Sequence, residues 1–160
     1  MHRERGFSLI ELLIVVAIIL VIAAMSVPNL IKSRLAANEA SAVSSLRSIN
    51  TAQTTYSITY PTNGYADNLA KLGAPAPGNP LSANNAGILD WVLGCAAQPC
   101  QKSGYSFTII NARGAPVSAY QTTGTPVTPG TTGIRGFCGS NASTIMSDPS
   151  GGTNCTVQIK

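Results

Sequence analysis

The hydrophobic positions of this chain are concentrated near its N-terminus. Residues 7 to 27 are apolar except for Ser8, Glu11 and Ser26. As an α-helix, a run of this length extends about 31 Å, and the hydrocarbon core of a bilayer is about 30 Å thick. The pattern therefore predicts a helix that can span a membrane.

A removed secretory signal peptide is the alternative explanation of this run. Arg3 and Arg5 precede it, and Ala24-Met25-Ser26 loosely fits the small-residue spacing of a signal cleavage site. Two features disfavour this alternative: the run is long for a signal peptide, and it contains Glu11. A carboxylate in a membrane helix costs up to about 2.5 to 3.5 kcal/mol at the bilayer centre, so it usually marks a function.

A helical pattern continues over residues 28 to 60, where apolar residues recur at spacings of three, four and seven. Pro28 is expected to kink this helix, and Pro61 with Asn63-Gly64 is expected to end it. The predicted apolar stripe consists of Leu35, Ala42, Leu46, Ile49, Tyr56 and Tyr60. The polar residues expected mostly on other faces are Lys32, Arg34, Glu39, Arg47 and Asn50.

The remaining residues, 61 to 160, predict a small head. Residues 61 to 100 are rich in proline and predict loops with one short helix around Ile88 to Leu93. Alternating apolar and polar residues then predict a hairpin of residues 105 to 110 and 117 to 122. The prolines and glycines from Thr125 to Gly133 predict a loop. A second hairpin is predicted from residues 134 to 138 and 144 to 146, around Gly139-Ser140-Asn141. Residues 156 to 159 can add an edge strand. Three or four antiparallel strands against the helix give an α+β fold.

The four cysteines all lie in the predicted head. They allow three pairings, and we favour Cys95 with Cys100 and Cys138 with Cys155, because each pair is the nearest in sequence and closes a loop with few apolar anchors. A zinc site is the alternative, but no histidine is near the cysteines and the sequence has no Cys-x-x-Cys spacing. Disulfides indicate an oxidising compartment, so the head is expected in the periplasm or outside the cell.

Composition argues against most enzymatic and nucleic-acid functions. The only histidine is His2, and no Gly-x-Ser-x-Gly motif occurs, so we expect no catalytic residues, no cofactor and no metal site. Lys and Arg outnumber Asp and Glu by 10 to 6, but the basic residues are scattered. This excess is too diffuse to predict nucleic-acid binding.

The segment Gly6-Phe7-Ser8-Leu9-Ile10-Glu11, with its basic leader and the apolar run behind it, resembles the N-terminus of type IV pilins and of type II secretion pseudopilins. The resemblance covers roughly residues 1 to 60. It implies that a prepilin peptidase removes residues 1 to 6 by cutting between Gly6 and Phe7 on the cytoplasmic face. The new N-terminal Phe7 is then methylated, and the apolar segment is retained. Because some secretion pseudopilins bind calcium in the head, Asp148 is a minor candidate for a calcium ligand.

Glu11 has no Lys or Arg within residues 7 to 27 to pair with. In a monomer it lies near the membrane interface, but in a packed filament core the charge needs a partner. The amine of a neighbouring subunit's Phe7, freed by cleavage, is the cation at that depth, and the family resemblance implies the same pairing. We therefore expect Glu11 to take part in assembly, and the family resemblance, whose motif includes Pro28, implies the same for Pro28.

These features together predict a structural subunit that polymerises into a type IV pilus-like filament through its N-terminal helix. The partners implied are copies of the same chain, the prepilin peptidase and an inner-membrane assembly platform. The subunit is expected to cross the inner membrane once before assembly and to join a surface or periplasmic filament afterwards. Two alternatives are a pseudopilin that drives protein export by type II secretion, and a membrane-tethered periplasmic binding or enzymatic module.

Overall fold

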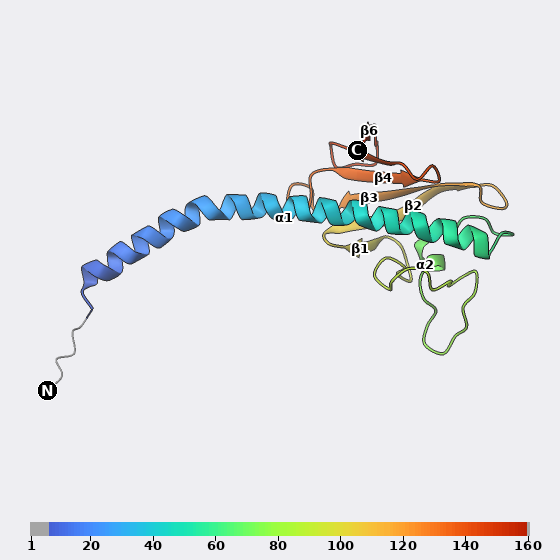
Figure 1. The fold of residues 1–160 in the computed structure, drawn as a ribbon, viewed down its shortest axis with the longest axis horizontal. Coiled ribbons are helices and arrows are strands. Elements are labelled where there is room, and N and C mark those ends of the chain that lie inside the picture. The colour runs from blue at the N-terminus through green and yellow to red at the C-terminus, as the bar shows by residue number, and fades with distance from the viewer. Residues whose placement is uncertain (1–6, 160) are drawn as a thin grey trace. The chain divides into compact units, whose positions relative to one another are not determined.

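The computed structural model describes residues 7–159 and divides the chain into two compact units, Met1–Arg34 and Leu35–Lys160. Helix α1, Leu9–Thr59, contributes residues to both units. The first unit is an apolar helical segment, and the second is the head (Figure 1).

Helix α1 begins and ends close to the positions that the sequence predicts. No glycine interrupts residues 7 to 63, and Pro61 follows the last helical residue, Thr59, at a distance of two positions. A proline at that place disfavours helical geometry in the residue before it. The helix continues through Pro28, so the predicted single helix is confirmed.

The head contains one antiparallel sheet of six strands in the order β1 to β6 along the chain. Each strand pairs with the next, which requires only short connections and no crossover. The α+β fold class predicted from the sequence is therefore confirmed. The strands are β1 Cys100–Lys102, β2 Tyr105–Arg113, β3 Ala119–Pro126, β4 Gly136–Ser140, β5 Ile145–Asp148 and β6 Val157–Gln158.

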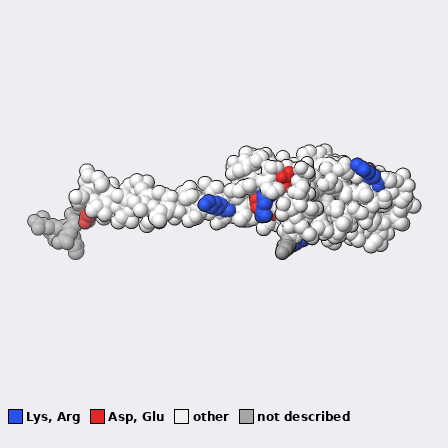
Figure 2. Space-filling view, turned by 90° about the horizontal axis from the view of Figure 1, so that it is seen from above, with Lys and Arg blue, Asp and Glu red and all other residues white. Residues whose placement is uncertain are grey.

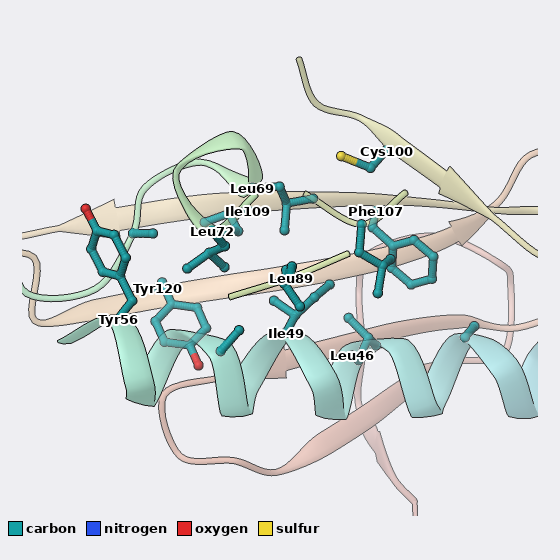
Figure 3. Close-up of a cluster of buried hydrophobic side chains, with 14 of the residues drawn as sticks. Leu46, Ile49, Tyr56, Leu69, Leu72, Leu89, Cys100, Phe107, Ile109 and Tyr120 are labelled. Atoms are coloured by element: carbon teal, nitrogen blue, oxygen red, sulfur yellow. The ribbon is translucent and has the colours of Figure 1, made fainter. Parts of the chain in front are cut away.

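Strand β2 shows why one face of the sheet packs on the helix. Tyr105, Phe107 and Ile109 are buried, and the residues between them are only partly covered. This alternation follows from the period of two in a strand. Together with Leu46 and Ile49 of α1, these side chains belong to the core of the head. Figure 3 shows Phe107 and Ile109 of this strand together with the two helix residues.

The loop that follows α1 is fixed to the helix by polar contacts. The Gln53 side chain is fully buried and donates to the carbonyl of Ala66 at 2.8 Å, while its oxygen accepts from the Ala66 N–H at 2.7 Å. The Tyr56 hydroxyl donates to the carbonyl of Ala83 at 2.6 Å. Because buried polar groups are stable only when hydrogen-bonded, these contacts compensate for the desolvation of Gln53.

Some predicted boundaries in the sheet were wrong. The sheet has six strands instead of three or four. The possible edge strand within residues 156 to 159 forms as β6, and β1, Cys100–Lys102, lacks an apolar pattern long enough to predict it. Strand β3 runs on to Pro126, where Thr125 and Pro126 pair with Ser106 and Tyr105, so the loop begins after the expected position. The second hairpin turns after Ser140 instead of around residues 139 to 141.

The short helix predicted around Ile88 to Leu93 was also wrong. The segment forms a turn in which the Asp90 carboxylate accepts the Leu93 N–H at 2.8 Å and the Gly94 N–H reaches the Asp90 carbonyl at 2.7 Å. The short helix lies instead at α2, Leu69–Leu72, with Asn68 as its N-cap. Aspartate and asparagine side chains that bond to nearby N–H groups account for both local structures.

Two polar residues expected on exposed faces of α1 are buried. Glu39 is 8% exposed and Asn50 is 6% exposed. Each has a polar partner from the sheet side of the head: Arg135 for Glu39, and the Tyr120 hydroxyl, at 3.2 Å, for Asn50. These partners lie 70 or more residues further along the chain, which is why helical periodicity alone placed both residues on the wrong face.

Truncation of Leu46 should destabilise the head strongly. Leu46 is fully buried between α1 and the sheet, so Leu46→Ala is expected to lower the free energy of unfolding by about 2 to 5 kcal/mol through lost burial and a residual cavity. The matched control is Ile58→Ala on the same helix, which removes a side chain that is 75% exposed and should cost less than about 0.5 kcal/mol. Denaturant unfolding followed by circular dichroism measures both values. Equal losses would contradict the packing described above.

Candidate functional site

The first candidate site is the start of α1, where the helix is capped by its own residues. The N–H groups of Glu11 and Leu12 donate to the Ser8 carbonyl at 3.1 and 3.2 Å. The Ser8 N–H in turn donates to Oε2 of Glu11 at 2.9 Å. Ser8 is therefore the N-cap and Glu11 the third helical residue, and the bond from the Ser8 N–H to the Glu11 carboxylate is one half of a capping box. The carboxylate also lies at the positive end of the helix dipole, which stabilises its charge.

Residues 7 to 34 are all exposed in the structure. The helix contains an 18-residue window with a mean hydropathy of 3.0, and it meets the length and composition requirements for crossing a membrane. The face drawn in Figure 2 is uncharged over most of this segment, with red near its start and blue toward its other end. A helix that is apolar on all sides is normally covered by lipid or by other helices, so this segment is a candidate for burial in a membrane or an assembly.

Pro28 lies inside this segment without interrupting the helix. Proline has no backbone N–H, so the carbonyl four residues earlier, that of Ala24, lacks its usual helical donor at this turn. Nearby, the Asn29 side chain donates to the carbonyl of Met25 at 3.4 Å. The kink at Pro28 stays a prediction.

The structure places the remaining predicted site residues as follows. Gly6 and the rest of the expected leader, residues 1 to 6, lie outside the described residues. Phe7 is 76% exposed and lies two residues before the start of α1, in the same apolar unit as Glu11 and Pro28. The head holds two disulfides, Cys95–Cys100 and Cys138–Cys155, which are the pairs that the sequence favours.

A second cluster joins α1 to the segment before β4. The Arg135 guanidinium donates from Nε and Nη2 to Oε2 of Glu39, at 2.9 and 2.7 Å, and the backbone N–H groups of Ile134 and Arg135 donate to Oε1 at 3.0 and 3.1 Å. Burial alone would raise the pKa of Glu39, but these four donors and the positive charge outweigh it, so the pKa lies below its usual value of 4.5. The carboxylate thus has a partner for each oxygen.

The same segment is held by further contacts on both sides. Asn38 on α1 donates from Nδ2 to the carbonyl of Thr132 at 2.8 Å, and the Tyr105 hydroxyl donates to the carbonyl of Arg135 at 2.9 Å. Burial, followed by the nearby Glu39 charge, raises the pKa of Tyr105. Tyr105 therefore acts as a neutral hydrogen-bond donor, and the cluster is structural.

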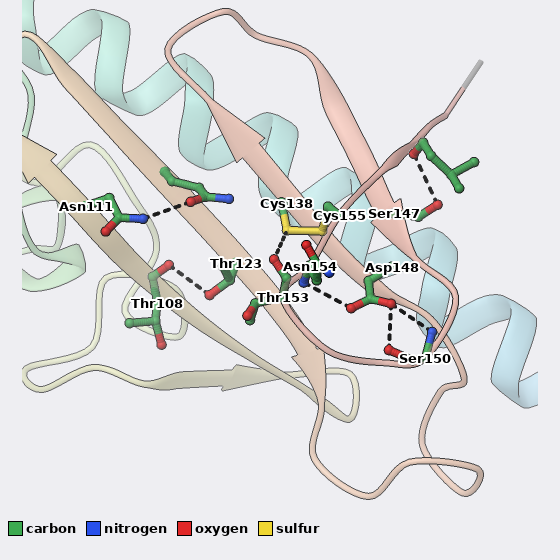
Figure 4. Close-up of a disulfide and its surroundings, with 12 residues drawn as sticks. Thr108, Asn111, Thr123, Cys138, Ser147, Asp148, Ser150, Thr153, Asn154 and Cys155 are labelled. Atoms are coloured by element: carbon green, nitrogen blue, oxygen red, sulfur yellow. Dashed lines mark hydrogen bonds between the residues drawn. A yellow bond between two sulfur atoms is a disulfide. The ribbon is translucent and has the colours of Figure 1, made fainter.

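The Cys138–Cys155 disulfide closes a loop that Asp148 organises from within (Figure 4). Oδ1 of Asp148 accepts from the Ser150 hydroxyl and N–H at 2.6 and 2.9 Å, and Oδ2 accepts from the Asn154 N–H at 3.0 Å. Hydrogen bonds from the Ser150 hydroxyl, then from the Ser150 N–H, lower the pKa of Asp148. Because N–H and O–H donors face both oxygens, Asp148 serves the loop and is unsuited to calcium in this arrangement.

The Cys95–Cys100 disulfide links the residue that follows the Asp90 turn to the first residue of β1. Beside it, Lys102 Nζ pairs with Asp90 Oδ2 at 3.0 Å. The pKa of Asp90 is lowered, mainly by the Leu93 N–H and then by the Lys102 side chain. Within residues 7–159, no group of three or more His, Cys, Asp or Glu residues is arranged to hold a metal ion.

Sequence reasoning missed the Ser8 cap and the Glu39–Arg135 pair. The spacing Ser8-x-x-Glu11 is a capping-box pattern and could have predicted the first. No local pattern could have predicted the second, because 95 residues separate Glu39 from the nearest of its donors, the Ile134 N–H. The only indication was its position. Glu39 follows Leu35, the first buried residue of the head, by four positions, which places the two side chains on the same face of the helix.

Comparisons with known proteins find one matching family and two similar pilus proteins. Residues 1–27 match the family described as the prokaryotic N-terminal methylation motif. The type IV major pilin protein PilA of Myxococcus xanthus is 46% identical over 54 residues, which cover 34% of this chain and 24% of that protein. The type IV wide pilus major component PilA4 of Thermus thermophilus is 42% identical over 72 residues, covering 45% of this chain and 53% of that protein.

These matches confirm the resemblance that the residues around Glu11 predict. This chain is homologous to type IV major pilins over the matched region, which amounts to 24% and 53% of the length of these two relatives. No solved structure matches the chain.

The Glu39–Arg135 cluster predicts acid-sensitive stability. Because the pKa of Glu39 is lower in the folded chain than in the unfolded chain, its contribution is fully present above about pH 4.5 and is lost as the pH falls through the lowered pKa. Glu39→Gln should lower the unfolding free energy at pH 7 by about 1 to 3 kcal/mol and flatten this pH dependence.

The control is Asp67→Asn, which removes the exposed Lys71–Asp67 pair and should cost about 0 to 1 kcal/mol. Denaturant unfolding of both variants between pH 3 and pH 7 provides the measurement. An unchanged pH profile in the Glu39→Gln variant would show that the pair contributes nothing to acid sensitivity.

Proposed function

We propose that this chain is a structural subunit of a type IV pilus-like filament and that it has no enzymatic activity. The observation that carries the proposal is an exposed apolar helix that starts with a capped carboxylate at Glu11 and coincides with the N-terminal methylation motif. Both curated relatives are named as pilus components, which favours a pilus over type II secretion. A membrane-tethered binding module has no comparable support.

The proposed maturation proceeds at the start of the apolar segment. A prepilin peptidase removes residues 1 to 6 between Gly6 and Phe7, and the new amine of Phe7 is methylated. The helix then stays in the inner membrane, with the head in the periplasm, until an assembly platform transfers the subunit into a filament. The two disulfides of the head support an oxidising compartment on that side of the membrane.

In the proposed assembly step, the apolar helix moves from lipid into contact with the helices of neighbouring subunits. In this exchange, the Glu11 carboxylate loses access to interfacial water, and its bond to the Ser8 N–H does not neutralise its charge. The Phe7 amine of a neighbouring subunit supplies the cation. A contact between different surfaces of neighbouring subunits does not close on itself, so it extends into a filament.

The mature protein is expected to begin at Phe7. Intact-mass measurement on membrane or filament material should show that residues 1 to 6 are absent and that one methyl group has been added, because the peptide bond after Gly6 is the proposed cleavage site. A mature terminus at Val27 or beyond would identify an ordinary secretory signal and would contradict the proposed function.

Replacements of Glu11 should separate its role as a helix cap from its proposed role as the partner of a neighbour's amine. Glu11→Gln retains an oxygen that can accept the Ser8 N–H but carries no charge, whereas Glu11→Ala removes both properties. Both variants should insert into the membrane, be cleaved and fold their heads. If pairing with a neighbour's amine sets the register, both should also reduce filament yield at least about tenfold, which corresponds to a loss of about 1.4 kcal/mol per contact.

Electron microscopy and quantification of sheared filaments measure the yield, and mass spectrometry confirms cleavage. Glu11→Asp, which retains the charge, is the control and should preserve more assembly than the other two variants. Normal filaments from Glu11→Gln would show that helix capping is the only role of Glu11 and would remove the pairing step.

A further inference from the structure

The head carries a groove, lined by residues of polar types, that none of the features described above uses. It has a volume of about 530 Å³ and lies where one face of α1 meets the turn between β4 and β5. Its walls are formed by polar side chains from these two elements. The lining residues are Arg47, Asn50, Thr51, Thr54 and Ser143.

Arg47 is the cation of this groove and has no acidic partner within the described chain. The carboxylates of the head are engaged elsewhere: those of Glu39, Asp67 and Asp90 in ion pairs, and that of Asp148 within its own loop. An exposed guanidinium presents planar N–H donors that suit a carboxylate. The groove therefore offers an uncompensated positive charge to a ligand.

Asn50 gives the groove a fixed second donor. Its Oδ1 accepts from the Tyr120 hydroxyl at 3.2 Å, and its amide lies so close to Gly139 that a Cβ at that position would be 3.1 Å from Nδ2. No described residue accepts from Nδ2. The Ser143 hydroxyl likewise has no partner among residues 7–159, so two neutral donors accompany Arg47.

Thr51 and Thr54 provide acceptors instead of donors. Their hydroxyls donate to the carbonyls of Arg47 and Asn50, four residues earlier in α1, at 3.0 and 3.1 Å. A hydroxyl whose proton is used in this way still has lone pairs free to accept a hydrogen bond. The helix face thus combines acceptors for ligand hydroxyl groups with donors for a carboxylate.

We propose that this groove binds a carboxylated sugar, such as a uronic acid unit of an acidic polysaccharide. The single cation suits one carboxylate, the threonine oxygens suit the sugar hydroxyls, and the volume suits one or two sugar rings. A nucleic-acid backbone would require several cations along its path, and only one lines the groove. The inference does not depend on filament assembly.

Titration of the detergent-solubilised full-length chain with galacturonate tests the proposal. Saturation-transfer NMR, with competition, gives the dissociation constant for galacturonate, for galactose, which lacks the carboxylate, and for acetate, which lacks the hydroxyls. Galacturonate should bind at least about tenfold more tightly than either, because only galacturonate uses both halves of the groove. Equal binding of acetate or inorganic phosphate would show a general anion site and overturn the proposal.

Two sets of variants locate the site. Arg47→Gln should weaken galacturonate binding about tenfold, because it removes the charged partner of the carboxylate. Its control is Arg113→Gln, which changes net charge equally at an exposed arginine outside the groove and should change binding less than about twofold. Equal losses in the two variants would indicate diffuse attraction and would contradict a defined site.

The double variant Thr51→Val and Thr54→Val tests the acceptors with little change in side-chain volume. It should weaken galacturonate binding and leave the binding of acetate unchanged, since acetate has no hydroxyl to donate. For every variant, a midpoint of thermal unfolding equal to that of the wild-type chain confirms that the head is folded. An unchanged preference for galacturonate over acetate would show that these hydroxyls do not recognise the sugar.

Discussion

An apolar helix that the described chain leaves uncovered is the constraint on which this molecule depends. Residues 7 to 34 are exposed, and burial of apolar surface contributes roughly 25 cal/mol per Å². Water is therefore an unfavourable environment for this segment, and either lipid or neighbouring helices must cover it. The two environments differ mainly in how they treat the one charge near the start of the segment, Glu11.

The cap at the helix start reduces the cost of that charge without removing it. The Ser8 N–H satisfies one carboxylate oxygen, and the helix dipole favours a negative group at this end. A single hydrogen bond and a partial charge do not replace hydration of an ion in a dry environment. The same carboxylate can therefore be tolerable at a membrane interface and require a cation in a helix bundle, which makes it sensitive to the change from one environment to the other.

The head has a hydrophobic core of its own, to which the apolar segment contributes no residue. Residues 35 to 59 of α1 provide one layer, and a meander of six short strands provides the other. Two disulfides hold the loops that have few apolar anchors, and Glu39 fastens the segment before β4 to the helix. Cross-links and a charged clamp are effective where a small core supplies limited hydrophobic stabilisation.

The sequence predicts periodic and local features of this structure well and long-range polar contacts poorly. The stripe from Leu35 to Tyr56 and the alternation in β2 follow from helix and strand periods, so the helix, its buried face and the first hairpin were predictable. Strand β1 is too short to show a period. Glu39 and Asn50 were placed on the wrong face because periodicity treats a polar residue as exposed, whereas Arg135 and Tyr120 make their burial favourable. The same reasoning explains why the groove at Arg47 could not be predicted: its donors and acceptors come from a helix and a turn that only the folded chain brings together.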